Sequence, residues 1–145
     1  MVFTVSIKIP NDARTERNGE AFLSAWALMP GLAVSAAEGQ LTIAMGELLV
    51  DECRKALRKY PTIDVFLSWP DVSGYAPKVR ADLADMVREL PAVRSIHVHS
   101  IAPIVSMGLT ALRLSTSVRV ECYSEEVPFL TAMRRLRSIT SSGPR

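Results

Sequence analysis

The chain contains only two cysteines and seven glycines, and both scarcities argue against whole classes of site. Cys53 and Cys122 lie far apart in apolar segments, which is typical of buried thiols in a reducing compartment rather than of a disulfide or a metal site. The glycines are dispersed singly, so the glycine-rich loops that hold phosphate in nucleotide hydrolases are absent.

Sequence signatures of well-known catalytic sites are also absent. The chain has no Gly-x-Ser-x-Gly elbow, no Gly-x-Gly-x-x-Gly fingerprint and no Cys-x-x-Cys pair. Its paired acids, Asp51-Glu52 and Glu125-Glu126, are neighbours in sequence, so regular structure turns them in different directions, as on a solvated surface. We therefore expect no catalytic residue, no metal ligand and no cofactor.

Long apolar runs and a strong net charge are missing as well. No stretch of about 18 apolar residues occurs, and no basic segment precedes the first apolar residues, so neither a membrane span nor a signal peptide is predicted. The formal net charge of +2 gives no reason to expect long nucleic acid as a partner but leaves room for a small anionic ligand. We expect residues 1–145 to form one cytoplasmic domain, with 138–145 as a flexible tail.

The alternation of strand and helix patterns predicts the fold class. Strands that alternate with helices pair in parallel through right-handed crossovers. The prediction is therefore an α/β protein, a three-layer Rossmann-like sandwich with a mostly parallel sheet. Strands are expected at 2–9, 63–69, 96–101 and 118–123, and helices at 20–29, 46–60, 78–90, 104–114 and 127–137.

The first third of the chain is less clearly patterned. Residues 11–20 are polar with both charge signs and predict a loop. Residues 32–45 contain two short apolar runs around Glu38-Gly39-Gln40, which fit either a hairpin with a glycine turn or one strand after a loop.

Polar and aromatic side chains collect where two predicted strands end near a proline. Strand 63–69 runs into Pro70 and a turn at 71–74, and strand 96–101 runs into Pro103 and a helix. The carboxyl ends of parallel strands meet at one edge of the sheet, where ligands bind in open α/β folds, so we predict a ligand site there. Backbone amides at 104–106 would hold a phosphate at the helix N-terminus. The predicted ligand-binding residues are Ser68, Trp69, Ser73, His99, Ser100, Pro103, Ser106 and Met107.

Two structural questions at this site stay open from the sequence. Trp69 could instead fill the gap between sheet and helix while the serines cap the turn. His97 and His99 share a face of one strand, and such a pair chelates a metal only with a third ligand. Asp64 lies at the far end of the preceding strand, about 16 Å away at ~3.3 Å per residue. We expect a buried, hydrogen-bonded His97 and a His99 that meets the ligand.

Residues 95–126 resemble a stretch of SAVED domains. The matching features are a strand with His97 near its start, the turn Ala102-Pro103 and a small-residue helix start that reaches Gly108. The segment 118–123, Val-Arg-Val-Glu-Cys-Tyr, is similar to the strand that follows in those domains. SAVED domains are related to the Rossmann-like CARF domains and bind cyclic oligonucleotide second messengers in bacterial anti-phage defence. The resemblance implies a sensor of this kind.

The resemblance also implies assembly. A full SAVED domain is a pair of CARF-like halves, and this chain supplies about one half. A homo-oligomer or a separate effector subunit would then complete it.

Two functions from different classes follow. The first is a sensor of a cyclic or linear oligonucleotide that signals by assembly. The second is a non-catalytic scaffold of a defence complex, in which the apolar helix 104–114 or the basic helix 127–137 docks a partner. An exposed apolar patch on either helix, with a filled crevice at the strand ends, would favour the scaffold. A third hypothesis is a small-molecule enzyme or phosphodiesterase that uses His97 and His99, such as a weak ring nuclease.

Overall fold

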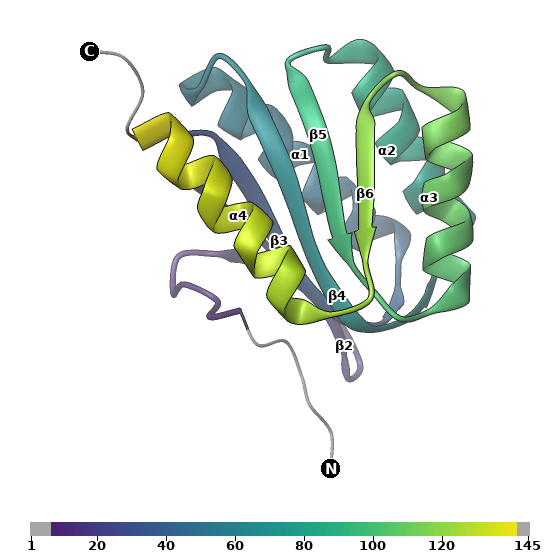
Figure 1. Cartoon of the computed structure of the whole chain (residues 1–145). Helices are drawn as coiled ribbons and strands as arrows, with labels where there is room; N and C mark the ends of the chain where they lie inside the picture. Colours follow the sequence, from purple (N-terminus) through teal and green to yellow (C-terminus); the bar gives the residue numbers. More distant parts are fainter. Residues whose placement is uncertain (1–6, 142–145) are drawn as a thin grey trace.

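The computed structural model describes residues 7–141, which form six strands and four helices that alternate from the third strand onward (Figure 1). The predicted strand over 2–9 lies mostly outside these residues, and its described part, 7–9, is not a strand. In chain order the elements are β1 (Arg14–Asn18), β2 (Ala21–Leu28), β3 (Leu32–Leu41), α1 (Ile43–Lys59), β4 (Ile63–Tyr75), α2 (Pro77–Glu89), β5 (Val93–His99), α3 (Pro103–Ser115), β6 (Arg119–Tyr123) and α4 (Glu126–Ser141).

The six strands form one sheet whose spatial order, β1-β2-β3-β4-β5-β6, is the order of the chain. The pairs β1–β2 and β2–β3 are antiparallel. Strands β3, β4, β5 and β6 run parallel, and each parallel connection carries one helix. The predicted α/β class with a mostly parallel sheet is confirmed.

The helices divide unequally between the two faces of the sheet (Figure 1). Helices α1, α2 and α3 cover one face, over a core that includes Val65, Leu67 and Ile96. Helix α4 alone crosses the other face, where Phe129 packs against Phe66. Three layers result, as predicted. Because the crossover helices share one face, the strand order of the parallel part never reverses, and the sheet lacks a topological switch point.

The N-terminal third departs from the prediction. The segment predicted as a helix over 20–29 forms β2, and the predicted loop over 11–20 contains β1. Both faces of β2 are buried, since Leu23 belongs to the core under α1 and Trp26 to the core under α4. A strand that is buried on both faces shows no alternation of apolar and polar residues, so its apolar spacing fitted a helix equally well.

Of the two interpretations of 32–45, the hairpin is wrong, because Leu32–Leu41 form one continuous strand. The hairpin lies earlier, at the turn between β2 and β3. Gly31 has a φ of 147° there, and a Cβ on it would lie 2.7 Å from a backbone oxygen. Glycine is therefore required at this turn.

Strand β4 continues past Pro70 to Tyr75, so the predicted turn at 71–74 is wrong. The register with β3 shifts there: Ala36 pairs with Ser68, but Glu38 pairs with Asp71. A bulge accommodates proline because its extra residue needs no hydrogen bond in the ladder. Pairing of β4 with β5 does end at Ser68, as the proline suggested.

The remaining predicted helices are present. Thr42 caps α1, with its hydroxyl accepting a hydrogen bond from the Met45 amide at 3.3 Å. Pro77 and Pro103 begin α2 and α3, positions where the missing N–H of proline costs nothing. Helix α4 continues to Ser141, beyond the predicted end at residue 137. Within residues 7–141, no helix combines the length and the apolar character that a membrane crossing requires.

The two cysteines have different environments. Cys53 is buried in α1, as predicted, and burial raises the pKa of its thiol to about 12. Cys122 is exposed, contrary to the prediction, because β6 is the edge strand of the sheet.

Candidate functional site

A row of polar side chains crosses three strands on the face covered by α4. Every second residue of a strand points to the same face of the sheet. The register pairs Asp64 of β4 with Ser95 of β5. Further along the same strands, it pairs Ser68 with His99. The row, called the polar lane below, consists of Asp64, Ser68, Ser95, His97, His99 and Tyr123.

Four hydrogen bonds link the first part of the polar lane. The Arg94 Nη2 atom donates to Asp64 Oδ2 at 2.6 Å. The Ser95 Oγ atom lies 2.6 Å from Asp64 Oδ1 and 3.0 Å from His97 Nε2. The His97 Nδ1 atom lies 2.9 Å from the hydroxyl of Tyr123. Asp64, Ser95 and His97 are all buried, and each residue in this hydrogen-bond network has a partner.

The proton positions follow from the carboxylate of Asp64, which can only accept. The single hydroxyl proton of Ser95 goes to Asp64, so Ser95 must accept from the Nε2–H of His97. The Nδ1 atom of His97 is then free to accept the hydroxyl proton of Tyr123. All donors therefore point toward Asp64, whose charge is balanced by Arg94.

Burial keeps the rings of His97 and Tyr123 in this hydrogen-bond network neutral. It lowers the pKa of His97, against the opposing charge of Asp64, and it raises the pKa of Tyr123. The His97 ring also stacks on Phe66, with centroids 4.4 Å apart and planes 4° apart. His97 is thus buried and hydrogen-bonded, as predicted. A fully paired network of this kind holds strands in register and presents no activated nucleophile.

The second part of the polar lane leaves polar atoms unpaired. Ser68 Oγ and His99 Nδ1 are buried without a hydrogen-bond partner among the described residues. The ring of Phe129, on α4, covers His99 at a centroid distance of 5.7 Å. Burial lowers the pKa of His99, opposed by the carboxylates of Glu126 and Asp71. Each unpaired buried group costs about 1–3 kcal/mol, so this pair is the polar lane's clearest sign of a missing partner.

Two carboxylates lie beyond this pair, in the last part of β3 and β4. Glu38 and Asp71 are paired across the strands, and each has one buried oxygen without a partner in the described part of the chain. Burial raises the pKa of Glu38, and the charge of Asp71 adds to the effect. Such surroundings favour a neutral or cationic group over a phosphate. Within residues 7–141, no three His, Cys, Asp or Glu side chains are arranged to hold a metal ion.

The eight residues predicted to bind a ligand lie in separate places. Ser68 and His99 are brought together in the polar lane, and Ser100 is buried just after β5. Trp69 points to the opposite face, where its indole nitrogen donates to a buried serine at 3.2 Å and its ring fills the core beneath α2 and α3. The other four are exposed, Ser73 on β4 and Pro103, Ser106 and Met107 on α3.

Sequence reasoning missed Asp64 and Ser95 as members of a site. The distance of Asp64 from the far end of its own strand says nothing about its neighbour on the next strand. A usable signal was present, because Asp64 and Ser68 have the same spacing as Ser95 and His99. Aligning the two strands by this spacing gives the observed register.

The outer side of α3 is a second candidate surface. Ile104, Met107, Ala111 and Leu114 are spaced by three, four and three residues, so they form one row, called the α3 stripe below. The exposed fractions of Ile104, Met107 and Leu114 are 47%, 70% and 83%. The opposite side of α3 is buried in the core. Ile101, just before the helix, extends the apolar surface.

A shallow groove separates the α3 stripe from α2. Its volume is about 300 Å³, and it is lined on α2 by two alanines and three charged residues, Arg80, Ala81, Ala84, Asp85 and Arg88, and on α3 by Ala111, Leu112 and Ser115. On the buried side of α3, Gly108 allows Tyr75 to approach the helix closely, since a Cβ there would lie 2.1 Å from the hydroxyl of Tyr75.

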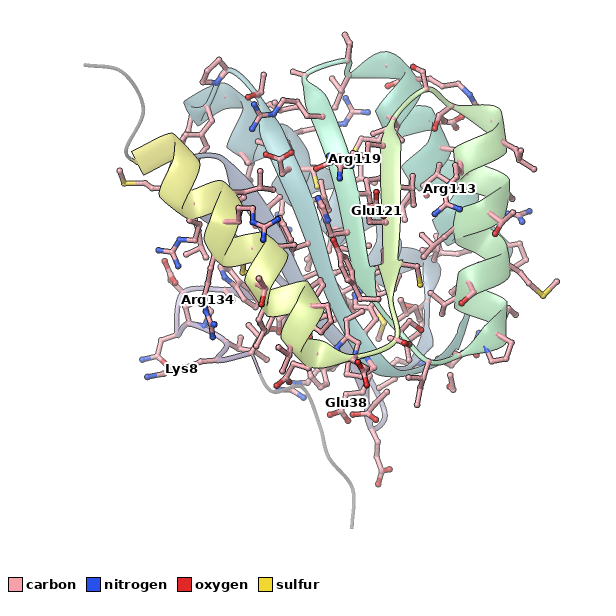
Figure 2. The ribbon with its side chains drawn as sticks, viewed as in Figure 1. Lys8, Glu38, Arg113, Arg119, Glu121 and Arg134 are labelled. Carbon is pink, nitrogen blue, oxygen red and sulfur yellow. The ribbon has the colours of Figure 1, made fainter. Side chains whose placement is uncertain are left out.

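Figure 2 shows Arg113 on α3, and Arg119 and Glu121 on the neighbouring strand β6. Arg119 and Glu121 form an ion pair at 3.2 Å on β6. Arg113, the only charged residue of α3, donates to the carbonyl of Val120 at 2.8 Å and so turns toward β6. The charges beside the α3 stripe come from α2 instead, where Arg80, Asp85 and Arg88 line the groove and the last two form an ion pair at 3.0 Å.

Comparisons with known proteins concern the fold alone. No family model and no curated protein matches the chain. Among solved structures, the chain is similar to an uncharacterized protein of the DUF3478 family, with a SpoIIAA-like fold, from Shewanella loihica PV-4. The TM-score is 0.56 at 13% sequence identity, and the similarity covers 83% of this chain and 90% of that one.

The resemblance to SAVED and CARF domains is wrong, because the similar structure has a SpoIIAA-like fold. The residues that suggested it, from His97 through Pro103 to Gly108, form a strand followed by a helix that begins at proline. Any parallel βα unit can contain that junction, so the motif did not specify a family. The chain is an α/β protein similar in fold to a SpoIIAA-like protein.

Proposed function

We propose that this chain is a non-catalytic protein-interaction module that binds a partner protein through the α3 stripe. The exposed row of Ile104, Met107 and Leu114 carries the proposal. Full burial of such a side chain contributes about 1.5–3 kcal/mol, so a row of them left in water is typical of a surface that a partner covers.

The closed strand ends support the same proposal. Phe129 packs over Phe66, His99 and Tyr123, so the edge that would hold a small ligand is filled by an aromatic side chain. The basic helix is a weaker candidate for docking, since Arg134 and Arg135 are exposed on α4 as on a solvated face. A role in a defence complex stays a prediction from sequence.

Site-specific photo-crosslinking in the cell tests the proposal. A benzophenone amino acid at Met107 should give a protein adduct on irradiation. The matched control carries the same group at Met29, which is 74% exposed in the turn between β2 and β3. Equal adducts at both positions, or none at Met107, would contradict docking through the α3 stripe.

A small-ligand sensor is the second candidate, favoured by the unpaired atoms of Ser68 and His99. A cyclic or linear oligonucleotide, the ligand predicted from the sequence, would bring its phosphates near the carboxylates of Glu38 and Asp71, which disfavours it. Melting curves with cyclic di-, tri- and tetranucleotides test it. A rise in melting temperature that His99→Phe abolishes would support the sensor, and a flat response would count against it. Product analysis of the same samples checks for ring cleavage.

A further inference from the structure

We propose that the last parts of β3, β4 and β5 form a binding site for the primary ammonium group of a small organic molecule. The site, called the amine site below, consists of Glu38, Ser68, Asp71 and His99. It is separate from the α3 stripe, and it gives the small-ligand function a ligand class other than an oligonucleotide.

Unpaired polar atoms gather at the amine site. The buried side-chain atoms without a hydrogen-bond partner among the described residues are Glu38 Oε1, Ser68 Oγ, Asp71 Oδ2 and His99 Nδ1. Register places Ser68 beside His99 and Glu38 beside Asp71. The charge of Asp71 acts on both Glu38 and His99, so its carboxyl group lies near both. Ser68 is only 1% exposed and His99 only 6%, and unpaired groups buried together in this way indicate a common partner.

The unpaired atoms call for a ligand that donates hydrogen bonds. An ionised carboxylate only accepts, and a neutral histidine ring can accept at one nitrogen. Burial lowers the pKa of His99, which keeps its ring neutral near pH 7. A primary ammonium carries three N–H donors. These three donors suffice for Glu38, Asp71 and one of the pair Ser68 and His99.

The charge around the amine site favours a cation. None of the ion pairs within residues 7–141 involves Glu38 or Asp71. Figure 2 shows Glu38 at the end of the sheet where α4 begins. The first turn of α4 contains Glu126, a third carboxylate, whose charge acts on His99 and offsets the positive end of the helix. Because no trio of His, Cys, Asp or Glu in the described part of the chain is placed to hold a metal ion, we expect the cation to be organic.

Access to the amine site limits the size of the group that it takes. Glu38 and Asp71 are partly exposed, whereas the ring of Phe129 covers His99 at a centroid distance of 5.7 Å. The ammonium group would therefore enter beside the two carboxylates, and the rest of the ligand would stay toward solvent. Phe129 also offers an aromatic face, which attracts a cation within about 6 Å. These features suit a single ammonium group better than a nucleotide.

Nitrogen-15 NMR of the histidine rings during a titration with n-butylammonium chloride tests the proposal. The Nδ1 resonance of His99 should shift, with a dissociation constant on the order of a millimolar, because so small a ligand makes few contacts. The melting temperature should rise over the same concentrations. Tetramethylammonium chloride is the matched control ligand, since it has the same charge but no N–H donor. At equal ionic strength it should change neither measurement.

Substitutions at the two carboxylates locate the binding. Glu38→Gln and Asp71→Asn should each weaken the binding of butylammonium at least tenfold. Both variants should fold, and without amine they should melt no lower than the wild-type chain, because each removes one of two repelling charges. Glu47→Gln, at an exposed carboxylate on α1, should bind butylammonium as the wild-type chain does.

Each result supports or overturns the amine site. A His99 that does not respond to butylammonium, an equal response to the two cations, or equal weakening by Glu47→Gln would overturn it. Should a carboxylate variant fail to fold, a wild-type His99 shift with butylammonium alone still supports the amine site, and the absence of that shift overturns it. Photo-crosslinking at Met107 does not involve the amine site, so the failure of either proposal leaves the other standing.

Discussion

Replacing Ser95 by alanine cuts the polar lane at its centre, and the structure sets the expected cost. The Ser95 hydroxyl serves two neighbours, because it donates to Asp64 Oδ1 and accepts from His97 Nε2. The alanine leaves both buried atoms unpaired, at about 1–3 kcal/mol each. Asp64 keeps the bond from Arg94, which favours the lower end for that atom. We expect the free energy of unfolding to fall by about 3 kcal/mol, a large share of the ~5–15 kcal/mol typical of a domain.

Chemical denaturation of the Ser95→Ala variant and the wild-type chain measures this loss. The matched control is Ser73→Ala, an exposed serine on β4, whose effect should stay within about 0.5 kcal/mol. Nitrogen-15 NMR of the wild-type chain adds an independent check, since the proton of His97 should be on Nε2. A proton on Nδ1 of His97 would refute the proposed direction of the hydrogen bonds from Tyr123 through His97 and Ser95 to Asp64. So would a decrease in the free energy of unfolding for Ser95→Ala that is no larger than the decrease for Ser73→Ala.

Three further predictions concern the rest of the molecule. Burial lowers the pKa of both histidines below their ordinary value of 6.5, so the unfolded chain takes up protons first as the pH falls. The free energy of unfolding should therefore be lower at about pH 5.5 than at about pH 7.5, and a double histidine-to-glutamine variant should lack most of that slope. Gly108→Ala should destabilise the protein by about 1–3 kcal/mol in thermal unfolding, because the new Cβ clashes with the Tyr75 hydroxyl. In a Tyr75→Ala background the same substitution should stabilise the protein by up to ~1 kcal/mol, because alanine favours a helix more than glycine does. A thiol reagent should label Cys122 in the native protein and Cys53 only after unfolding, and mass spectrometry showing native labelling of Cys53 would contradict its burial.

Local sequence pattern predicts the parallel part of the fold well because each of its strands is separated from the next by an amphipathic helix. The strand at 63–69 and the helix at 78–90 lie where predicted, apart from shifts at their ends. Pattern fails at β2, where both faces of the strand are buried and alternation disappears. It fails again at Pro70, because a bulge lets the strand continue through a proline.

The candidate site is less predictable because register joins residues that are distant in the chain. Ser68 and His99 were both named from sequence, and the structure makes them neighbours. Trp69 was named with them, but successive residues of a strand point to opposite faces, so Trp69 shares the core of Val65 and Leu67 instead. Asp64 and Ser95 were missed because their contact depends on how β4 aligns with β5.

Topology explains why the exposed helix surface, rather than the strand ends, is the better candidate for binding. In a doubly wound sheet, helices on opposite faces diverge at the switch point and leave a crevice at the carboxyl ends of the strands. Here the three crossover helices share one face, and on the other face α4 places Phe129 over His99. Helix α3 is the last of the three and lies beside the edge strand β6, so it has a neighbouring helix on only one side (Figure 1). Within residues 7–141, the outer row of α3 stays open to solvent, with Ile104, Met107 and Leu114 exposed by 47%, 70% and 83%.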